Sequence, residues 1–216
     1  ANDRDVEDNF KVSSDPDDTR AVYVADQDID GVSEIYSVPI AGGTPVKLNP
    51  TLLPDAEVDR WNYDLTPDGQ RVVFVVDMGR TYPDYALFSV PVTGPASAAI
   101  EISGPMVAGG SLYAFPPTRF KISPDSQRVA YRADQDTDEV YELYSVPVVG
   151  PPGTSTKLSG PMQPDGGLEM NPSYRFSPDS QWVTYVADQE TDNVWELFIS
   201  GEGEYQIYLP LTLRDA

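Results

Sequence analysis

The sequence predicts an all-β protein made of four repeats of four antiparallel strands each. One stretch occurs four times, around prolines at positions 16, 67, 124 and 178, which stand 51, 57 and 54 residues apart. A period of this length indicates one supersecondary unit that is built several times and stacked. Within each copy short apolar segments alternate with polar turns, and no window keeps the apolar spacing of a helix.

The third copy is the cleanest and sets the order of the strands. Its first strand is expected at residues 120–123, ahead of Pro124-Asp125-Ser126, whose residue types favour a tight turn. The remaining elements follow in order: a second strand at 128–133, a polar loop at 134–139, an aromatic-rich third strand at 140–146 and a weaker fourth strand at 156–159.

The other three copies repeat this order. Their second strands are expected at 20–25, 71–76 and 182–187, their third strands at 33–38, 85–90 and 194–199, and their fourth strands at 44–48, 99–102 and 204–209. Such units are typical of β-propeller blades; a β-solenoid, with shorter repeats and parallel sheets, is the alternative. The sequence therefore predicts one domain over residues 1–216, alone or as part of a larger propeller or assembly, with blades near 10–49, 61–103, 118–159 and 173–213.

The repeated motif resembles a known family. Ser123-Pro124-Asp125-Ser126, an apolar strand, an Asp-rich loop and Glu142-Leu143-Tyr144 are similar to the Pro-Asp blade motif of TolB-type and WD-repeat-like β-propellers. The turn recurs at 66–69, 177–180 and, less closely, 15–18, and the later strand recurs at 34–36 and 196–198. The resemblance implies the fold, but such propellers serve as binding platforms, peptidase caps and hydrolase domains alike. This chain differs in its longer repeats and in having four copies, where the family commonly has six or more.

The composition excludes several kinds of catalytic site. The chain has 216 residues, of which none is cysteine or histidine. Disulfides, thiolate or imidazole metal sites and Ser-His-Asp or Cys-His mechanisms are therefore ruled out. Carboxylate pairs such as Asp136 and Asp138 are chemically able to transfer protons, but nothing marks them as a catalytic pair. We expect a chain that is not an enzyme.

The charge balance limits the partners. With 14 basic and 35 acidic residues the net charge is −21, which repels nucleic acid and anionic membranes and attracts cations or basic proteins. The alternative is that the charge only keeps a β-rich surface soluble. No apolar run approaches the roughly 20 residues of a membrane helix, so no membrane insertion is expected. The start at Ala1-Asn2-Asp3 resembles a terminus left by signal cleavage, and we expect an extracellular, cell-surface or periplasmic protein.

Acidic residues recur in one frame after three of the second strands. Acids at relative positions 1, 3, 5 and 9 resemble the front of a calcium loop, which makes calcium the candidate cofactor. The alternative is that these acids cap the loop and pair locally. The acid expected at position 12 is missing, and the second copy, 77–81, lacks the pattern. The candidate ligands are Asp26, Asp28, Asp30, Glu34, Asp134, Asp136, Asp138, Glu142, Asp188, Glu190, Asp192 and Glu196.

Propeller topology predicts where these loops lie. If the first strand of each blade is innermost, the loops between second and third strands emerge on the same face as the links between blades, at 49–60, 104–117 and 160–173. Loops on a rigid scaffold commonly bind ligands; the alternative is that these links serve only as connections. The aromatic residues that recur on the first strands are expected to pack between blades: Tyr63, Phe120 and Tyr174.

The end of the chain is a candidate interface. Apolar residues alternate there, which predicts a long strand with one apolar face, and Pro210 indicates an edge position or a break. The interface residues are Tyr205, Ile207, Leu209, Leu211 and Leu213. The chain starts with a first strand and ends with a fourth, without strand exchange between them. Four blades must then close, be covered by another copy or a partner, or belong to a longer protein.

Three functions remain open. The first is a non-enzymatic, secreted or surface-exposed propeller that acts through protein contacts, including self-association through its terminal strands. The second is a calcium-stabilised recognition module whose acidic face binds a cationic or carbohydrate partner. The third is the propeller cap of a larger hydrolase or peptidase.

Overall fold

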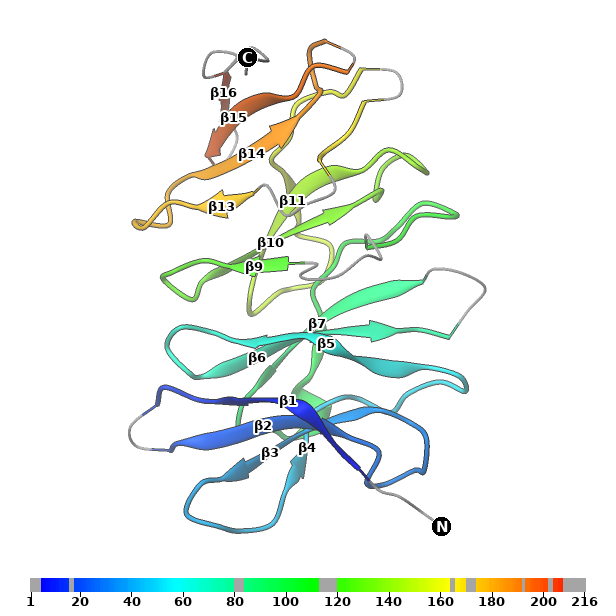
Figure 1. Cartoon of the computed structure of the whole chain (residues 1–216), viewed down its shortest axis with the longest axis vertical. Helices are drawn as coiled ribbons and strands as arrows, with labels where there is room; N and C mark the ends of the chain where they lie inside the picture. The colour runs from blue at the N-terminus through cyan, green and yellow to red at the C-terminus, as the bar shows by residue number, and fades with distance from the viewer. Residues whose placement is uncertain are drawn as a thin grey trace, which may run out of the picture.

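A computed structural model of the chain describes residues 5–15, 18–79, 84–112, 120–163, 166–169, 174–191, 193–201 and 204–207. These residues form four antiparallel sheets of four strands each. The sheets follow one another in chain order along the long axis of the molecule, so the first and fourth lie at opposite ends (Figure 1). This confirms the predicted all-β fold of four four-stranded units.

Each sheet, called a blade below, pairs its strands in chain order. Blade 1 contains β1 (Val6–Val12), β2 (Arg20–Ala25), β3 (Glu34–Pro39) and β4 (Val46–Lys47). Blade 2 contains β5 (Glu57–Leu65), β6 (Arg71–Asp77), β7 (Tyr85–Pro91) and β8 (Ile100–Glu101), with the 3-10 helix η1 (Ala96–Ala98) before β8. Blade 3 contains β9 (Phe120–Ile122), β10 (Arg128–Ala133), β11 (Glu142–Pro147) and β12 (Thr156–Lys157). Blade 4 contains β13 (Arg175–Phe176), β14 (Val183–Ala187), β15 (Glu196–Gly201) and β16 (Glu204–Ile207).

The first strands begin earlier than the sequence predicts. β1 and β5 start at Val6 and Glu57, ahead of the expected positions 10 and 61. Each contains an irregularity that shifts its register near the expected start. In blades 3 and 4 the same part of the strand is an isolated bridge, Leu112 with Ala133 and Leu168 with Ala187. A bulge breaks the alternation of apolar and polar residues, so the pattern that predicts strands does not extend across it.

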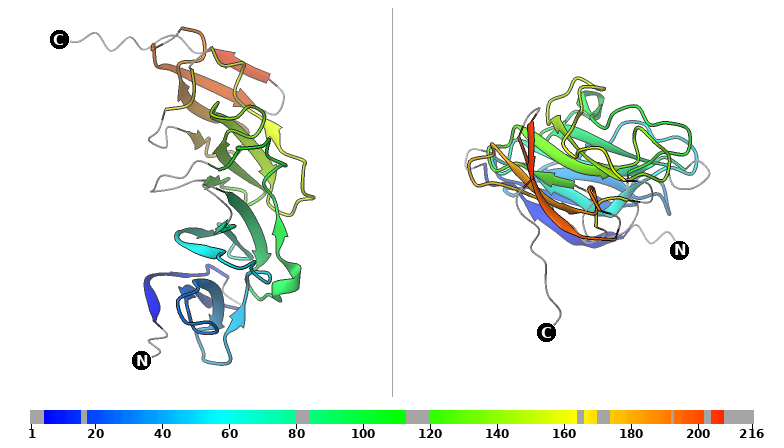
Figure 2. Two further views of the ribbon diagram at one scale, coloured as in Figure 1. Left: turned by 90° about the vertical axis from the view of Figure 1, so that its right-hand side faces the viewer. Right: turned by 90° about the horizontal axis from the view of Figure 1, so that it is seen from above.

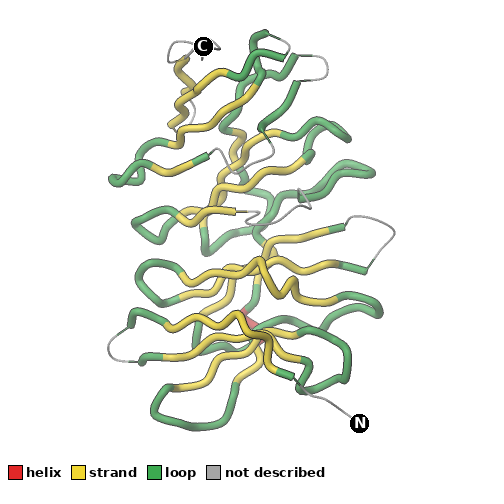
Figure 3. The backbone as a smooth tube through the Cα atoms, viewed as in Figure 1, coloured by secondary structure: helices red, strands yellow, loops and turns green. Residues whose placement is uncertain are grey.

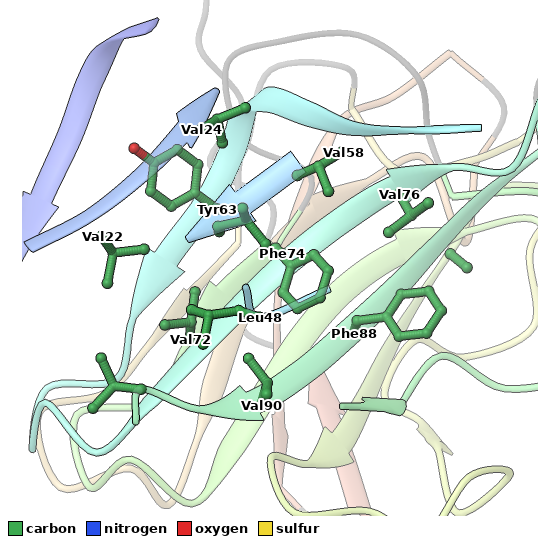
Figure 4. Packing of buried hydrophobic residues seen from close by; sticks show 13 residues of the cluster. Val22, Val24, Leu48, Val58, Tyr63, Val72, Phe74, Val76, Phe88 and Val90 are labelled. Carbon is green, nitrogen blue, oxygen red and sulfur yellow. The ribbon is translucent and has the colours of Figure 1, made fainter. Parts of the chain in front are cut away.

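Both faces of a blade are apolar because each inner blade lies between two others. We call the face toward the next blade in chain order the forward face and the opposite one the rear face. The forward face of blade 1 packs on the rear face of blade 2, and Figure 4 shows part of this cluster: Val22, Val24, Leu48, Val58, Tyr63, Val72, Phe74, Val76, Phe88 and Val90. Equivalent clusters join blades 2 and 3 and blades 3 and 4.

Aromatic side chains fill each rear face. The predicted first-strand aromatics Tyr63, Phe120 and Tyr174 are only 3%, 6% and 3% exposed, which confirms that they pack between blades. The second and third strands of each blade add a stacked ring pair, with centroid distances of 5.7, 5.6, 5.8 and 5.3 Å, formed by Tyr23–Tyr36, Phe74–Phe88, Tyr131–Tyr144 and Tyr185–Phe198. Such offset pairs stabilise beyond their buried area.

The loops divide between two sides of the stack. In Figure 3 the turns between first and second strands lie on the left, and the loops between second and third strands lie on the right. Figure 2 shows that the stack is curved, with its two ends apart. Among the residues that the structure describes, no helix has the length and apolar character of a membrane span.

Candidate functional site: the link face

The loops between second and third strands contact the links between blades, and we call the side that they share the link face. In blade 3 the Ser111 N–H donates to Asp134 Oδ1 at 2.6 Å, and the Asp134 N–H donates to the Ser111 carbonyl at 3.3 Å. Blade 4 repeats both bonds between Gly167 and Asp188, at 2.6 and 3.3 Å. The predicted position of the acidic loops beside the links is therefore confirmed.

The first acid of each loop is a structural cap. Asp26 Oδ2 accepts the Gly31 N–H and Asp134 Oδ2 accepts the Glu139 N–H, both at 3.1 Å. Asp134 and Asp188 are only 3% and 5% exposed. Carboxylates that accept backbone N–H groups in this way close the loop and hold the neighbouring link, as the alternative interpretation of the acid pattern expects.

Two glutamines next to these acids were missed by the sequence analysis. The Gly160 N–H donates to Gln189 Oε1 at 2.8 Å, and the Tyr185 hydroxyl donates to the same oxygen at 3.0 Å. In blade 3 the Tyr131 hydroxyl donates to Gln135 Oε1 at 2.8 Å. There the Gly104 N–H donates to the Tyr131 hydroxyl at 3.2 Å, so in both blades the glutamine and the tyrosine of the second strand hold the start of the preceding link.

The recurring Ser-Gly-Pro-Met sequence was the signal for this contact. A Cβ added at Gly104 would lie 2.7 Å from the Gln135 side chain, and one at Gly160 would lie 2.5 Å from Gln189 Nε2. Glycine therefore fits where the glutamine crosses the link. The preceding Ser103 and Ser159 accept the N–H groups of the third strands, each at 3.1 Å.

In two loops the acids at relative positions 3 and 9 both contact one lysine from the fourth strand. Lys47 Nζ lies 3.0 Å from Asp28 Oδ2 and 2.7 Å from Glu34 Oε1. In blade 3 Lys157 Nζ lies 2.7 Å from both Asp136 Oδ2 and Glu142 Oε2. A tyrosine hydroxyl completes each group, from Tyr36 to Glu34 and from Tyr144 to Glu142.

The electrostatics of this lysine bridge follow from its contacts. Burial acts to lower the pKa of Lys157, but hydrogen bonds to Asp136 and Glu142 outweigh it and hold that pKa above the ordinary value. Burial and the Glu142 carboxylate raise the pKa of Tyr144. The ammonium group thus occupies the place between two acids that the calcium prediction assigned to a metal ion.

Blade 4 keeps the acids but not the lysine. Its register pairs Phe198 with Ile207 where blade 3 pairs Tyr144 with Lys157, so both the hydroxyl and the ammonium group are lost. Glu196 is 8% exposed, and among the residues that the structure describes its buried Oε2 has no hydrogen-bond partner.

The remaining predicted ligands do not gather. Asp30, Asp138 and Glu190 are exposed on the loops, and Asp192 lies outside the described residues. In the described part of the chain no three acidic, histidine or cysteine side chains come together in a way that would hold a metal ion. The structure pairs acids within blades 1 and 3 rather than collecting all four.

The loop of blade 2 contacts its link through backbone. Asp77 holds the first position and accepts the Gly79 N–H at 3.0 Å. A Cβ added at Gly79 would lie 2.4 Å from the Asp55 carbonyl oxygen, and Gly79 has a φ of +68°. This close approach replaces the acidic contacts of the other loops.

Exposed apolar side chains also lie on the link face. They project from the loops and links of different blades, at 37–57% exposure: Ile29, Leu53, Val107, Val194 and Trp195. The link face therefore combines exposed carboxylates with exposed apolar groups on loops that a rigid frame holds in place.

The predicted terminal interface is only partly described. Tyr205 and Ile207 lie on β16, the outer strand of blade 4, where they pair with Ser200 and Phe198 of β15. Leu209, Leu211 and Leu213 lie outside the described residues.

Comparison with protein-family models and with curated proteins gives no match. Among solved structures, prolyl oligopeptidase B from Galerina marginata matches 93% of this chain and 30% of its own, at 12% identity and a TM-score of 0.60. The β-propeller domain of the Trilobed protease from Pyrococcus furiosus matches 95% of this chain and 57% of its own, at 10% identity and a TM-score of 0.50. TolB from Acinetobacter baumannii matches 91% of this chain and 42% of its own, at 19% identity and a TM-score of 0.47.

The chain spans less than two thirds of each of these structures. At such identities the likeness establishes the fold, and the predicted β-propeller blades are confirmed. The similar structures include propellers that belong to peptidases.

Proposed function

We propose that this chain is a non-enzymatic, secreted or cell-surface interaction platform that binds a protein partner on its link face. The observation that supports the proposal most is the set of exposed carboxylates and apolar side chains on the link face. A surface of this kind fits a partner segment with basic and apolar residues, which the net charge of −21 also attracts. The same charge disfavours nucleic acid and anionic lipid.

Charge reversal on the link face tests this proposal. The probe is an array of short peptides rich in lysine, arginine and leucine, read by bound fluorescent protein. Asp30→Lys and Asp138→Lys together are expected to reduce binding at least tenfold, as is Trp195→Ala. The matched controls Glu101→Lys on the outer strand β8 and Val149→Ala on the turn after β11 should bind like the parent. Equal binding by all variants would contradict the link face as the site.

A calcium-stabilised recognition module is the second candidate, and Glu196 favours it in blade 4. Glu196 holds the position at which Glu34 and Glu142 bind a lysine ammonium group in blades 1 and 3, and its buried Oε2 has no hydrogen-bond partner in the described part of the chain. A cation held by Glu196 and Glu190 would take that role.

Calorimetry with calcium checks this second candidate. One binding heat is expected, lost in Glu196→Gln and retained in the control Glu142→Gln. If a chelator leaves the melting temperature unchanged and calcium gives no binding heat, the proposal of a calcium-stabilised module is contradicted.

The third candidate is a cap on a larger hydrolase or peptidase, supported by the match to a prolyl oligopeptidase of which this chain covers 30%. In that case the catalytic groups would belong to another domain. The purified chain is expected to cleave neither ester nor proline-containing peptide substrates. Turnover of either substrate would overturn the non-enzymatic proposal.

Self-association through the terminal strand is also part of the proposal. β16 is an edge strand, and the apolar alternation of its sequence continues through Leu213. A chain ending at Tyr205 is expected to lose any self-association that sedimentation velocity detects in the full chain. An unchanged sedimentation coefficient would contradict a role for this strand.

A further inference from the structure

The rear face of blade 1 exposes residues that every other blade buries. Phe10 is 66% exposed, whereas Tyr63 and Phe120 at the same register position in blades 2 and 3, and Tyr174 directly before β13 in blade 4, are at most 6% exposed. The difference arises because, among the residues that the structure describes, no blade packs against β1 from that side.

The other end of β1 shows the same contrast. Val6 is 58% exposed, whereas the residues at its register position in the other blades are 1%, 0% and 2% exposed: Val58, Leu112 and Leu168. Val12, on the same face, is 48% exposed. The rear face of blade 1 is thus built like an interface from one end of β1 to the other.

The forward face of blade 4 is the complementary case. Leu197 is partly exposed, while its equivalents Ile35, Leu87 and Leu143 are fully buried by the following blade. Val186 is partly exposed where two other blades bury a valine completely.

Two positions that are polar on the three covered forward faces are apolar on this one. In blade 1 Arg20 Nε donates to Ser37 Oγ at 3.2 Å, and in blade 2 Arg71 Nε donates to Ser89 Oγ at 2.9 Å. Blade 4 has Trp182 and Ile199 at these two positions, and Trp182 is 38% exposed. A polar pair that suits an internal contact is replaced by two large apolar side chains.

We propose that the forward face of blade 4 binds the rear face of blade 1 in a second copy of the chain, and that two copies close in this way into a ring of eight blades. The three internal interfaces all join a forward face to a rear face, and the two free faces are one of each kind. The contact therefore continues an interface that the fold already uses. It rests on the proposed self-association and adds the faces of the two end blades to the terminal strand β16 of blade 4 as its contact surface.

Symmetry and size support a closed pair. One contact between unlike faces leaves a dimer with one free forward face and one free rear face. If the rotation between the two copies is about 180°, a second identical contact covers both of these faces and closes the ring. The stack in Figure 2 is curved, as in a propeller, and eight blades lie within the known range of propellers. Because each copy carries a charge of −21, added salt should strengthen the association by screening repulsion.

Light scattering on the full chain tests the pairing. At an ionic strength of about 0.5 M, where the Debye length is a few ångströms, the expected mass is twice 23.7 kDa. Phe10→Asp and Trp182→Asp should each give monomers, since each destroys one of the two faces. Val149→Asp is the matched control, because Val149 is 62% exposed but lies on neither end face, and it should remain a dimer. Circular dichroism establishes that each variant is folded.

Mixing the two monomeric variants is the decisive step. Each retains one intact face, so an equimolar mixture should recover a dimer through a single contact. A mixture that stays monomeric would overturn the pairing of unlike faces, as would a parent chain that is monomeric or a dimer that survives both variants. A mass that grows beyond two copies would overturn the closed ring. Peptide binding on the link face, measured separately, distinguishes a failure of this inference from a failure of the proposed function.

Discussion

Two serines hold neighbouring blades together from a backbone conformation that favours glycine. Ser126 has a φ of +65° and its Oγ accepts the Asp68 N–H of the preceding blade at 3.0 Å. Ser180 has a φ of +62° and accepts the Asp125 N–H at 3.0 Å. At this position blade 2 has Gly69, where an added Cβ would lie 2.7 Å from a backbone nitrogen of blade 1. The neighbouring turn thus determines which residue fits.

Substituting Ser126 separates the hydrogen bond from the backbone cost. Ser126→Ala should lower the free energy of unfolding by about 1–3 kcal/mol, because it leaves the Asp68 N–H without its acceptor. Ser126→Gly loses the same bond but regains about 1 kcal/mol from a residue suited to positive φ. Urea unfolding of both variants, with Ser180→Ala as the equivalent at the next interface, measures the difference. Identical values for the Ala and Gly variants would contradict a backbone cost at this serine.

The carboxyl group of Asp125 links stability to pH. Slight burial acts to raise its pKa, but hydrogen bonds from the Ser123 hydroxyl and the Gln127 N–H, with the Arg128 charge, lower it below the unfolded value of 3.8. A group with a depressed pKa contributes stability above the unfolded value and loses it as the pH falls through the folded value. Stability should therefore fall below pH 3.8.

Asp125→Asn should flatten this acid limb, since the neutral amide does not titrate. The measurement is the urea midpoint at a series of pH values between neutral and strongly acidic. Asp30→Asn, on an exposed loop, is the control and should keep the slope of the parent. An acid limb unchanged by Asp125→Asn would show that other carboxylates determine it.

At the scale of the element, the lysine from the fourth strand explains why two acidic loops tolerate a buried glutamate. Glu34 and Glu142 are 3% and 4% exposed, and each reaches a lysine and a tyrosine hydroxyl. Removing one partner of a buried charge is costly because the other charge remains buried. Each of these fourth strands is only two residues long, and the lysine bridge adds to its attachment.

Lys157→Met should lower the free energy of unfolding by about 1–2 kcal/mol, a value discounted because the lysine is one-third exposed. Ile207→Lys would supply the missing ammonium group to Glu196 and should raise stability by up to about 1 kcal/mol. Lys11→Met removes an ion pair with the exposed Asp64 and should change little. Thermal unfolding compares the three variants, and a destabilising Ile207→Lys would contradict the equivalence of the blades.

The strands were predictable because their signals are local. Alternating apolar residues and Pro-Asp turns placed β2 and β10 within their observed bounds. The turn of blade 1 was misplaced, because the sequence aligned Pro16 with the other prolines. The Arg20 N–H instead donates to Ser13 Oγ seven residues before it, whereas the equivalent Arg128 donates to Ser123 five residues before it, so this turn is two residues longer.

The partners of the acids were not predictable from their spacing. Lys47 and Lys157 reach the acids through strand pairing with Tyr36 and Tyr144, a contact that no local pattern encodes. Spacing alone suggested four convergent ligands. In the fold the acid at relative position 1 instead contacts a link, and the acids at positions 3 and 9 contact a lysine.

At the scale of the whole molecule, the chain is a one-dimensional stack. Each inner blade has two packed faces and each end blade has one, so stability is the sum of blade terms and nearest-neighbour terms. The end blades should therefore open at lower free energy than the middle pair.

Hydrogen exchange on the monomeric Phe10→Asp variant tests this order, because pairing between copies would protect the ends. Amides of β6, β7, β10 and β11 should exchange more slowly than those of β2, β3, β14 and β15. The control is the same measurement on the parent at low concentration. Uniform protection over all four blades would indicate one cooperative unit and contradict the nearest-neighbour account.

The serine contact between successive turns has a consequence for how such chains evolve. Deleting residues 124–177, a unit of 54 residues, would join Ser123 to Pro178 and bring the turn that carries Ser180 beside that of blade 2. The Asp68 N–H would then meet the hydroxyl of Ser180, the equivalent of the Ser126 that accepts it now. Recombination between repeats can therefore change the number of blades while keeping the same kind of contact between neighbouring turns.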